Sequence, residues 1–577
     1  MKNYIYILLI PLLLGACTSS KSTSKDDNGD TEGLSYTEQS RLIKMLFEGE
    51  KAELKNDPVK AISYYRECAS IDPNSDVAYF KMATVYFSLG NYQTASSHVK
   101  KAIDIEPTNK WYYLLLTKCY LGLSETELAT ETFAKILELE PDNIDYQLEM
   151  LELYAQQGKF DKAIEMLEDI EEKHGKRPEF NIRKQDFYMA NGQPDKAIES
   201  CLELIEQYPT QANYYGLLAI LYEHVGDKEK ELETYNRLLE VDPQNGLAHL
   251  KLSYIYQGRG EREMSENEMI EAFNSPDLDV EIKINVLTQY YQQLLSDRDL
   301  WPYVESLLSN FEHAHPSDSR TYSVISDFLS LKKDYSKARE YLLQSIALQK
   351  DRFQVWNQLI IIDSELQDWS ALVEHSEKAL ELFPSNPALY YYLGIGYFQL
   401  KEYDEAIEIL ETGKMMIFKS EAGLVDFYVL LGDTYNALDN FVKSDENYDL
   451  ALEANPNNAY VLNNFAYYLS LRKEKLDQAE TMAQKAVELE PDQYNYQDTY
   501  GWVLFRAEKY EEAAKWLKLA VNNGGDINGE IIEHYGDALF KTGDVEEALR
   551  QWKRAKQVGD ASELIDEKIS SGSYIEN

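Results

Sequence analysis

Prolines recur along this chain at an interval of about 34 residues, and that interval limits the folds the chain can adopt. Pro73, Pro107 and Pro141 are evenly spaced, Pro209 follows at twice that spacing, and Pro243 lies one further interval along the chain. Each proline follows a stretch with helical hydrophobic periodicity, and a proline ends a helix and opens a turn. The interval therefore predicts a repeated helix–turn–helix unit.

The residue pattern inside the interval supports this prediction. The motif Tyr-x2-Leu-Gly-x2-Tyr begins at Tyr390 and again at Tyr428. Its small residues let two helices approach closely, while its large residues fill the space between the helix ridges. Turn signals separate the two helices of a unit at Gly90-Asn91, Gly158-Lys159, Gly192-Gln193, Gly226-Asp227 and Gly543-Asp544. In period and motif the chain resembles the tetratricopeptide repeat (TPR) family.

The resemblance to TPR proteins implies an all-α fold. We expect a right-handed superhelical solenoid of about fifteen helix–turn–helix units between Leu42 and Asp560. Between 277 and 318 the motif is loose, which predicts a degenerate repeat. The predicted order is a signal peptide at 1–16, a lipidated cysteine and flexible tether at 17–37, an N-terminal TPR array at 38–276, the degenerate repeat or bend at 277–318, a C-terminal TPR array at 319–560 and a capping tail at 561–577.

The amino-terminal residues are predicted to be a targeting signal and not part of the fold. Tyr4 to Leu14 is an apolar run of eleven residues, too short to span a bilayer of about 30 Å and typical of a secretory signal. The residues Leu14 to Cys17 resemble the bacterial lipoprotein signal, which implies cleavage before Cys17 and lipidation of that cysteine. The alternative is an ordinary signal peptide followed by a chance cysteine. Residues 18–33 contain no aliphatic or aromatic side chain, as expected of a flexible tether.

The lipoprotein resemblance also implies a location. Several acyl chains hold a protein on a membrane, whereas one chain does so only marginally. Thr18 follows the cysteine in place of the aspartate that commonly retains such lipoproteins in the inner membrane, so we expect the outer membrane, with the protein facing the periplasm. The cluster Lys25-Asp26-Asp27 is similar to acidic signals for export to the cell surface, which keeps surface exposure as the alternative.

Composition excludes several classes of partner. The formal net charge is −43, which would repel nucleic-acid phosphates and anionic lipid headgroups, so we expect no nucleic-acid binding.

The 44 tyrosines are largely the aromatic positions of the repeat motif, where the ring packs and the hydroxyl finds a partner at the helix edge. Cys68, Cys119 and Cys201 fall in predicted helices without close spacing, and we expect them to be small core residues.

No pattern in the chain predicts catalysis. Gly394-Ile395-Gly396 begins like a dinucleotide-binding loop, but it lies inside a predicted helix and Gln399 replaces the third glycine. His313-Ala314-His315 has no further ligand nearby that would complete a metal site. We therefore expect a protein that is not an enzyme, with no cofactor and no bound metal.

Aromatic and amide side chains mark a candidate partner-binding face. By resemblance, the first helices of TPR units line a concave surface, and aromatic residues dominate binding hot spots while amides can clamp a peptide backbone. The alternative is that these aromatic residues pack between neighbouring helices. The candidates are Tyr391, Phe398, Tyr460, Asn463, Tyr467, Asn495, Asp498, Trp502 and Phe505.

The predicted function is that of an interaction scaffold. The segments 463–469, 498–504 and 533–537 together resemble the C-terminal arrays of bacterial envelope TPR lipoproteins. That resemblance implies a membrane-anchored adaptor for proteins of assembly, secretion or cell-wall processes, and an acidic groove favours basic or neutral protein or peptide partners. The alternative is a surface-exposed lipoprotein that binds glycans or other extracellular ligands through an aromatic-lined concave face.

Overall fold

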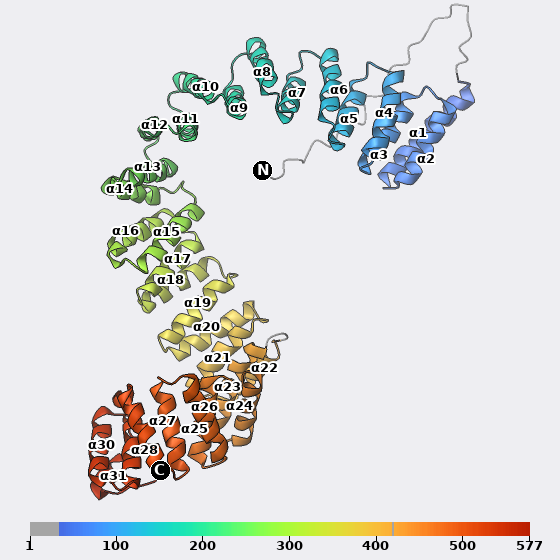
Figure 1. Ribbon diagram of the computed structural model, residues 1–577. Helices are drawn as coiled ribbons and strands as arrows, with labels where there is room; N and C mark the ends of the chain where they lie inside the picture. Colours follow the sequence, from blue (N-terminus) through green and yellow to red (C-terminus); the bar gives the residue numbers. More distant parts are fainter. Residues whose placement is uncertain (1–33, 418–420, 577) are drawn as a thin grey trace, which may run out of the picture. The chain divides into compact units, whose positions relative to one another are not determined.

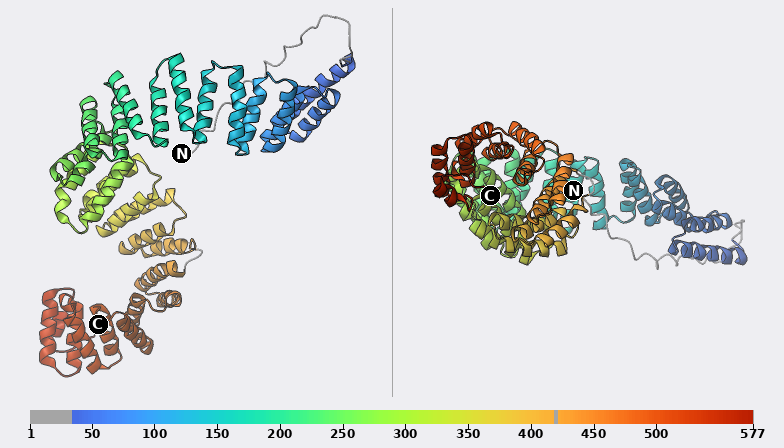
Figure 2. Two further views of the ribbon diagram at one scale, coloured as in Figure 1. Left: turned by 45° about the horizontal axis from the view of Figure 1, so that its top comes forward. Right: turned by 90° about the horizontal axis from the view of Figure 1, so that it is seen from below.

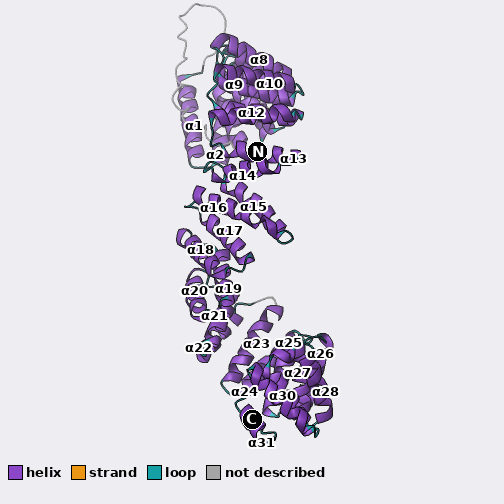
Figure 3. Cartoon of the chain, turned by 90° about the vertical axis from the view of Figure 1, so that its left-hand side faces the viewer, coloured by secondary structure: helices purple, strands orange, loops and turns teal. Residues whose placement is uncertain are grey.

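The computed structural model describes residues 34–417 and 421–576, and within these ranges the chain is built from helices and turns (Figure 1, Figure 3). The described residues form 31 α-helices and two short 3-10 helices, with no strand among them. The predicted all-α repeat fold is confirmed. Cys17, the whole predicted signal peptide and most of the predicted tether lie outside the described residues.

Contacts divide the chain into two compact units, Met1–Pro243 and Gln244–Asn577. The described helices of the first unit are α1 (Tyr36–Leu54), α2 (Pro58–Ile71), α3 (Asp76–Ser88), α4 (Tyr92–Ile105), α5 (Lys110–Gly122), α6 (Thr126–Leu139), α7 (Ile144–Gln156), α8 (Phe160–His174), α9 (Pro178–Ala190), α10 (Pro194–Gln207), α11 (Ala212–Val225) and α12 (Lys228–Val241).

The second unit holds the remaining helices. They are α13 (Gly246–Arg259), α14 (Arg262–Asn274), α15 (Val280–Leu294), η1 (Arg298–Leu300), α16 (Trp301–Ala314), α17 (Ser319–Leu331), α18 (Tyr335–Leu348), α19 (Phe353–Glu365), α20 (Trp369–Leu382), α21 (Pro387–Gln399), α22 (Tyr403–Lys414), α23 (Glu421–Ala437), α24 (Phe441–Ala454), α25 (Ala459–Arg472), α26 (Leu476–Leu489), α27 (Tyr494–Arg506), α28 (Tyr510–Asn522), η2 (Gly525–Ile527), α29 (Gly529–Lys541), α30 (Val545–Val558) and α31 (Ile565–Ser571).

Successive helices form pairs joined by short turns, and Figure 2 shows the pairs standing next to one another within each unit. Helices α1 to α30 make fifteen pairs, which confirms the predicted number of repeats, and α31 follows the last pair. In the loose region between 277 and 318, α15 and α16 form a pair whose connection contains η1. No helix in the described part of the chain is long and apolar enough to cross a membrane.

The turn inside a pair requires a left-handed backbone. Gly90, Gly158, Gly192, Gly226 and Gly543, the predicted turn glycines, all have positive φ, between 68° and 94°. Glycine adopts this conformation without the steric cost that a Cβ brings. Other pairs make the same turn with a residue that carries a side chain, and it too has positive φ: Ser124, Lys333, Gln367, Lys401, Asp439 and Glu508.

The turn between pairs is closed by a recurring hydrogen bond. A tyrosine shortly after the proline donates its hydroxyl proton to the proline carbonyl, at 2.8–3.0 Å, in Tyr113–Pro107, Tyr215–Pro209, Tyr322–Pro316 and Tyr390–Pro384. Glutamine side chains do the same at Gln147–Pro141 and Gln497–Pro491. For these tyrosines, the expected hydroxyl partner at the helix edge is therefore a carbonyl of their own turn.

Small side chains set the distance between the two helices of a pair. A Cβ added at Gly394 would lie 2.5 Å from Leu410 of the partner helix, so the helices pack in contact at this position. Cys68, Cys119 and Cys201 are buried free thiols in such helices, as expected, and burial raises the pKa of each to about 11, 12 and 12.

Candidate functional site

Among the first helices of the last three pairs, α25, α27 and α29, the middle helix α27 packs on both of the others, and the three form one surface of the second unit. Each contributes a polar residue at the same repeat position, because Asn463, Asp498 and Glu533 are equally spaced along the sequence. Residues one helical turn before or after these positions lie on the same helix face, and they contact side chains of the neighbouring first helix. Most of the site consists of such contacts.

Three stacked rings form the centre of the site. His534 of α29 lies on the indole of Trp502, with ring centroids 3.9 Å apart and an angle of 16° between the planes. On α27 itself, Trp502 stacks on Phe505 at 4.9 Å. All three side chains are buried, so they form a fixed aromatic wall and not a loose cluster.

Asp498 of α27 holds the imidazole of His534 in place. Its Nδ1 lies 3.1 Å and 3.2 Å from the two carboxylate oxygens of Asp498. Burial alone would lower the pKa of His534, but Asp498, with Glu530 and Asp537 nearby, outweighs burial and raises that pKa. The ring thus links α27 and α29 electrostatically as well as by stacking.

Tyr467 extends the connection to α25. Its hydroxyl donates to Glu530 Oε1 at 2.7 Å, which joins the first and last of the three helices over 63 residues of sequence. Tyr467 is half-buried, and the side chain of Glu530 is half exposed.

A buried ion cluster lies beside the stacked rings. Lys568 of α31 donates to Glu533 at 2.7 Å and to both oxygens of Asp537 at 2.7 and 2.9 Å. Trp552 donates its indole proton to Asp537 at 2.8 Å. Burial raises the pKa of Asp537 to about 6. Burial also acts to raise the pKa of Glu533, but hydrogen bonds from Lys568 and Ser562 more than offset it and the pKa is lowered.

A cavity of about 570 Å³ opens between the stacked rings and the segment that leads into α31. Acidic side chains outnumber basic ones around it, and the indole N–H of Trp502 has no acceptor among the described residues. Such a cavity is suited to a cationic or hydrogen-bonding side chain of a partner. Its lining is Trp502, Glu530, Glu533, His534, Asp537, Asp560, Ala561, Ser562, Glu563, Leu564 and Lys568.

The structure brings four of the nine predicted residues together here, namely Tyr467, Asp498, Trp502 and Phe505. Asp498 and both aromatic residues on α27 are buried and contact neighbouring helices, so they support the site from within. Of these four, Trp502 lines the cavity itself.

The other five predicted residues lie apart from the cavity. Tyr391 and Phe398 are half-buried on α21, next to Phe427 and Tyr403 respectively. Asn463 is buried and donates to Asn464 at 3.2 Å. Tyr460, at 53% exposure, and Asn495 point to solvent.

The candidates named from the sequence did not include Glu530, Glu533, His534, Ser562 and Lys568 of the cavity lining, although Glu533 and His534 lie in the segment 533–537 singled out above. The equal spacing from Asn463 through Asp498 to Glu533 was a usable signal for the first three, because it places them on adjacent first helices. No repeat signal precedes Lys568, which belongs to the helix after the last pair.

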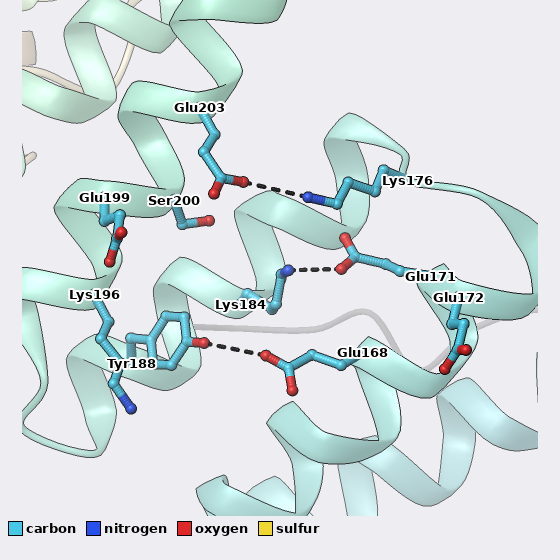
Figure 4. A pocket seen from close by; sticks show the side chains of 10 residues that line it. All are labelled: Glu168, Glu171, Glu172, Lys176, Lys184, Tyr188, Lys196, Glu199, Ser200 and Glu203. Atoms are coloured by element: carbon cyan, nitrogen blue, oxygen red, sulfur yellow. Dashed lines mark hydrogen bonds and ion pairs between the residues drawn. The ribbon is translucent and has the colours of Figure 1, made fainter.

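A second cavity, of about 530 Å³, lies in the first unit among α8, α9 and α10 (Figure 4). Lys184 pairs with Glu171 at 2.6 Å in a buried contact, Lys176 pairs with Glu203 at 3.5 Å, and Lys196 lies over the ring of Tyr188. Its cations are thus engaged with groups of the same cavity, which tie the three helices together. The cavity of the second unit, with its acidic excess, is the better candidate for a partner.

Family models confirm the repeat type that the motif predicts. Three models described as tetratricopeptide repeat match the chain, the first at 87–153 and 154–221, the second at 374–413 and 469–527, and the third at 212–245 and 425–458. Together the matched segments span about half of the chain and lie in both units. No curated protein sequence was found to match.

Several solved structures are similar to part or most of the chain. A complex of Naa15/Naa10 bound to HypK-THB is 14% identical, with 93% of this chain and 94% of that chain covered and a TM-score of 0.39. The APC/C hetero-tetramer Cut9-Hcn1 is also 14% identical, with 93% and 97% covered and a TM-score of 0.36. A tetratricopeptide repeat protein from Parabacteroides merdae is 17% identical, with 44% and 98% covered and a TM-score of 0.37.

Proposed function

The chain belongs to the tetratricopeptide repeat family, and from that premise we propose that it is a lipid-anchored scaffold of the bacterial cell envelope whose last three repeats dock a protein partner. Tetratricopeptide repeat arrays are scaffolds for protein–protein interaction. The observation that carries the proposed docking site is the cavity of about 570 Å³ between the stacked rings and the segment before α31.

The lining of this cavity favours a basic or neutral partner segment. Its lining contains five acidic residues and the lysine Lys568. The acidic residues are Glu530, Glu533, Asp537, Asp560 and Glu563. A lysine or arginine side chain of the partner would gain from these carboxylates and from the face of Trp502. The stacked rings keep the wall rigid, so the protein loses little conformational entropy on binding.

The anchor of the scaffold is Cys17, by the lipoprotein signal that precedes it. Lipidation there, followed by the polar tether at 18–33, would hold the array close to the outer membrane on its periplasmic side. The scaffold has no catalytic activity of its own in this proposal, and its role is to bring envelope proteins together.

The docking site is tested by a charge reversal at Glu530. In cells, a photocrosslinker at Leu564, an uncharged residue of the cavity lining, captures partners that dock in the cavity, and E530K is expected to reduce this capture at least fivefold. The control is E512K, an exposed glutamate on the second helix α28, which makes the same charge change away from the cavity. Equal capture by wild type, E530K and E512K would refute the site.

The anchor is tested separately by C17S. The wild-type chain is expected in the membrane fraction and C17S in the soluble fraction, while both keep the same helical circular dichroism signal. Protease added to intact cells then distinguishes a periplasmic location of the array from a location on the cell surface. Protection of the array supports the periplasmic location, and its cleavage supports the cell surface and contradicts the proposal as stated.

A further inference from the structure

The segment after α31 turns back along the array. The label C in Figure 1 marks the end of the chain beside the last helices. Residues 572–576 leave α31 and contact residues at the ends of α29, α27 and α25 in turn. The four residues they meet there are Lys541, Phe505, Arg506 and Lys473, which we call the basic strip. Each stands at or next to the end of one of the three first helices.

Tyr574 makes the aromatic contact with the basic strip. Its ring lies edge-on to the ring of Phe505, with centroids 5.5 Å apart. The ammonium group of Lys541 lies over the same ring at 4.4 Å from its centroid. The ammonium group of Lys568 on α31 also lies over this ring, at 5.3 Å from its centroid. The tyrosine thus contacts an aromatic edge and two cations, and each of these contacts is favourable.

Glu576 makes the ionic contact. Its carboxylate pairs with Lys473 and, at 3.3 Å, with Arg506. The hydrogen bond from Lys473 is the main reason that the pKa of Glu576 is lowered, with Arg506 and Lys541 contributing. In a chain of net charge −43, this strip is a local positive surface that selects a carboxylate.

The basic strip is held in place by contacts other than those with the segment. Arg506 donates through Nε to the carbonyl of Ser470 at 3.2 Å, and its guanidinium lies over Trp502. Lys473 ends α25 in the left-handed conformation, with φ of 55°. Phe505 stacks on Trp502. A surface fixed in this way is preorganised for a ligand.

The spacing of the two contacts defines a simple recognition pattern. Tyr574 and Glu576 are separated by one residue, and in an extended chain residues i and i+2 point to the same side. One side of a short extended peptide can therefore place an aromatic ring on Phe505 and a carboxylate between Lys473 and Arg506. The neighbouring cavity shares Trp502 with this surface, because that ring stacks on Phe505.

We propose that the basic strip is a peptide-binding site and that residues 572–576 are its internal ligand. The partner is a protein with an extended segment in which an aromatic residue is followed two positions later by Asp or Glu, and this segment takes the strip when the chain's own segment leaves it. This inference rests on the proposed function in assuming that the second unit docks a protein. It adds the sequence pattern of the partner and a competitor built into the chain.

Competition from the internal ligand should be measurable. A ligand joined to its site by a short flexible connection acts at an effective concentration of about 1 mM. If the free peptide binds with a dissociation constant of about 100 μM, the attached segment reduces its apparent affinity about tenfold. Removal of the segment should therefore raise the affinity by about that factor.

The experiment uses a fluorescein-labelled, carboxy-amidated peptide with the sequence of residues 570–577 and measures its fluorescence anisotropy. We expect binding to the chain truncated after Ser571 about tenfold tighter than to the full chain. A full-length double variant, Y574A/E576K, opens the strip without shortening the chain and should show the same gain. In the truncated chain, K473E should weaken binding at least fivefold, whereas K518E, an exposed lysine on α28, should leave it unchanged.

Several outcomes would overturn the inference. No binding to either opened chain at about 1 mM peptide, equal to the effective concentration, would show that the segment is only a structural cap. Equal binding by K473E and K518E would place the peptide elsewhere. A full-length chain that is dimeric in light scattering, and monomeric once truncated, would mean that the segment joins two copies. None of these outcomes would change the crosslinking test of the cavity, in which E530K reduces the capture of partners. The failure of this inference can therefore be told apart from the failure of the proposed function.

Discussion

At the scale of single residues, the second unit depends on a lysine that is almost completely buried. Lys568 is 2% exposed and neutralises Glu533 and Asp537, which are similarly buried. Removing one member of a buried ion cluster leaves the other charges without compensation, and this costs about 3–5 kcal/mol.

We therefore expect K568M to lower the free energy of unfolding of the second unit by about 3–5 kcal/mol. Urea unfolding followed by tryptophan fluorescence measures it, because Trp502, Trp516 and Trp552 lie in this unit. The control is K556M, whose lysine is half exposed and pairs with Asp566 at the surface, for which a loss of at most about 1 kcal/mol is expected. Equal losses in the two variants would contradict the role of the buried cluster.

The same residues predict how stability depends on pH. The pKa of His534 is raised by Asp498 against the effect of burial, and burial raises the pKa of Asp537 to about 6. A group whose pKa is raised in the folded state contributes stability below its unfolded pKa and loses it as pH rises through the folded pKa. Both groups therefore favour the folded second unit at the acidic end of the range from about pH 5.5 to pH 8.

The prediction is that H534Q reduces this pH dependence. In the wild type these two groups act to raise the urea midpoint of the second unit as the pH falls from about 8 to about 5.5, and H534Q removes the contribution of His534. Asp327, whose pKa burial raises to about 6, acts in the same direction in both chains. His315, whose pKa is lowered, acts in the opposite direction but is present in both chains. H313Q, at an exposed histidine, should behave as the wild type does. An unchanged pH dependence in H534Q would disprove the assignment.

Sequence reasoning at this scale found side chains but not their exposure. The spacing of Trp502 and Phe505 correctly placed them on one helix face, where they stack. Trp502 is buried against His534, which lies on the first helix of the following pair. Such a contact follows from the packing of two repeats, and neither repeat contains it in its own sequence.

At the scale of helices and turns, close contacts decide which glycines can be replaced. A Cβ added at Gly536 would lie 2.6 Å from Cδ1 of the fully buried Trp552, whereas one added at Gly258 would meet nothing within 4 Å. Both glycines lie inside helices of the second unit. The same substitution should therefore have opposite effects at the two positions.

We expect G536A to destabilise the second unit by about 1–3 kcal/mol, because the crowded Trp552 must shift. G258A should stabilise it by about 0.5–1 kcal/mol, because alanine restricts the unfolded chain and favours the helix. Thermal unfolding followed by circular dichroism measures both effects: the midpoint temperature should fall in G536A and rise in G258A. Stabilisation by G536A would mean that α29 and α30 are not in close contact at this crossing.

The sequence predicted the helices and turns well because their signals are local. Proline at the end of a unit and glycine inside it act through the backbone of the same residues. The turns at Lys333, Gln367 and Lys401 contain no glycine and so gave no such signal. A residue with a side chain adopts positive φ at a steric cost, which the packing of the flanking helices must offset. The tyrosine–proline hydrogen bonds were foreseen only as a hydroxyl partner at the helix edge.

At the scale of the whole molecule, the fold depends on contacts between helices that are close in the sequence. Within each unit, the helices that pack most extensively are neighbours or next neighbours in the chain. In such an array stability is close to the sum of repeat and interface terms, and a complete set of pairs can fold alone. The boundary between Pro243 and Gln244 falls between two helix pairs.

The fragment 244–577 is therefore expected to fold by itself. Its helical circular dichroism signal per residue should equal that of the full chain, with one cooperative urea transition. The matched control is the fragment 262–577, which begins at α14 and removes its partner α13. This fragment should unfold at lower urea concentration, since one face of α14 loses its cover. Two fragments of equal stability would contradict the pairwise account of the fold.

The sequence could not predict the path of the last residues. The repeat period ends with α30, and nothing in the polar residues that follow specifies that Glu576 pairs with Arg506, 70 residues earlier. This contact exists because α31 packs after the last pair and directs the chain back.

That return has a mechanical consequence. A row of repeats under tension can lose its units one at a time, each at the force that its own interfaces withstand. Because residues 572–576 fasten the end of the row to α27 and α25, the last three repeats form a closed loop. A load pulling on α1 would unravel the open repeats first and reach the last three repeats last.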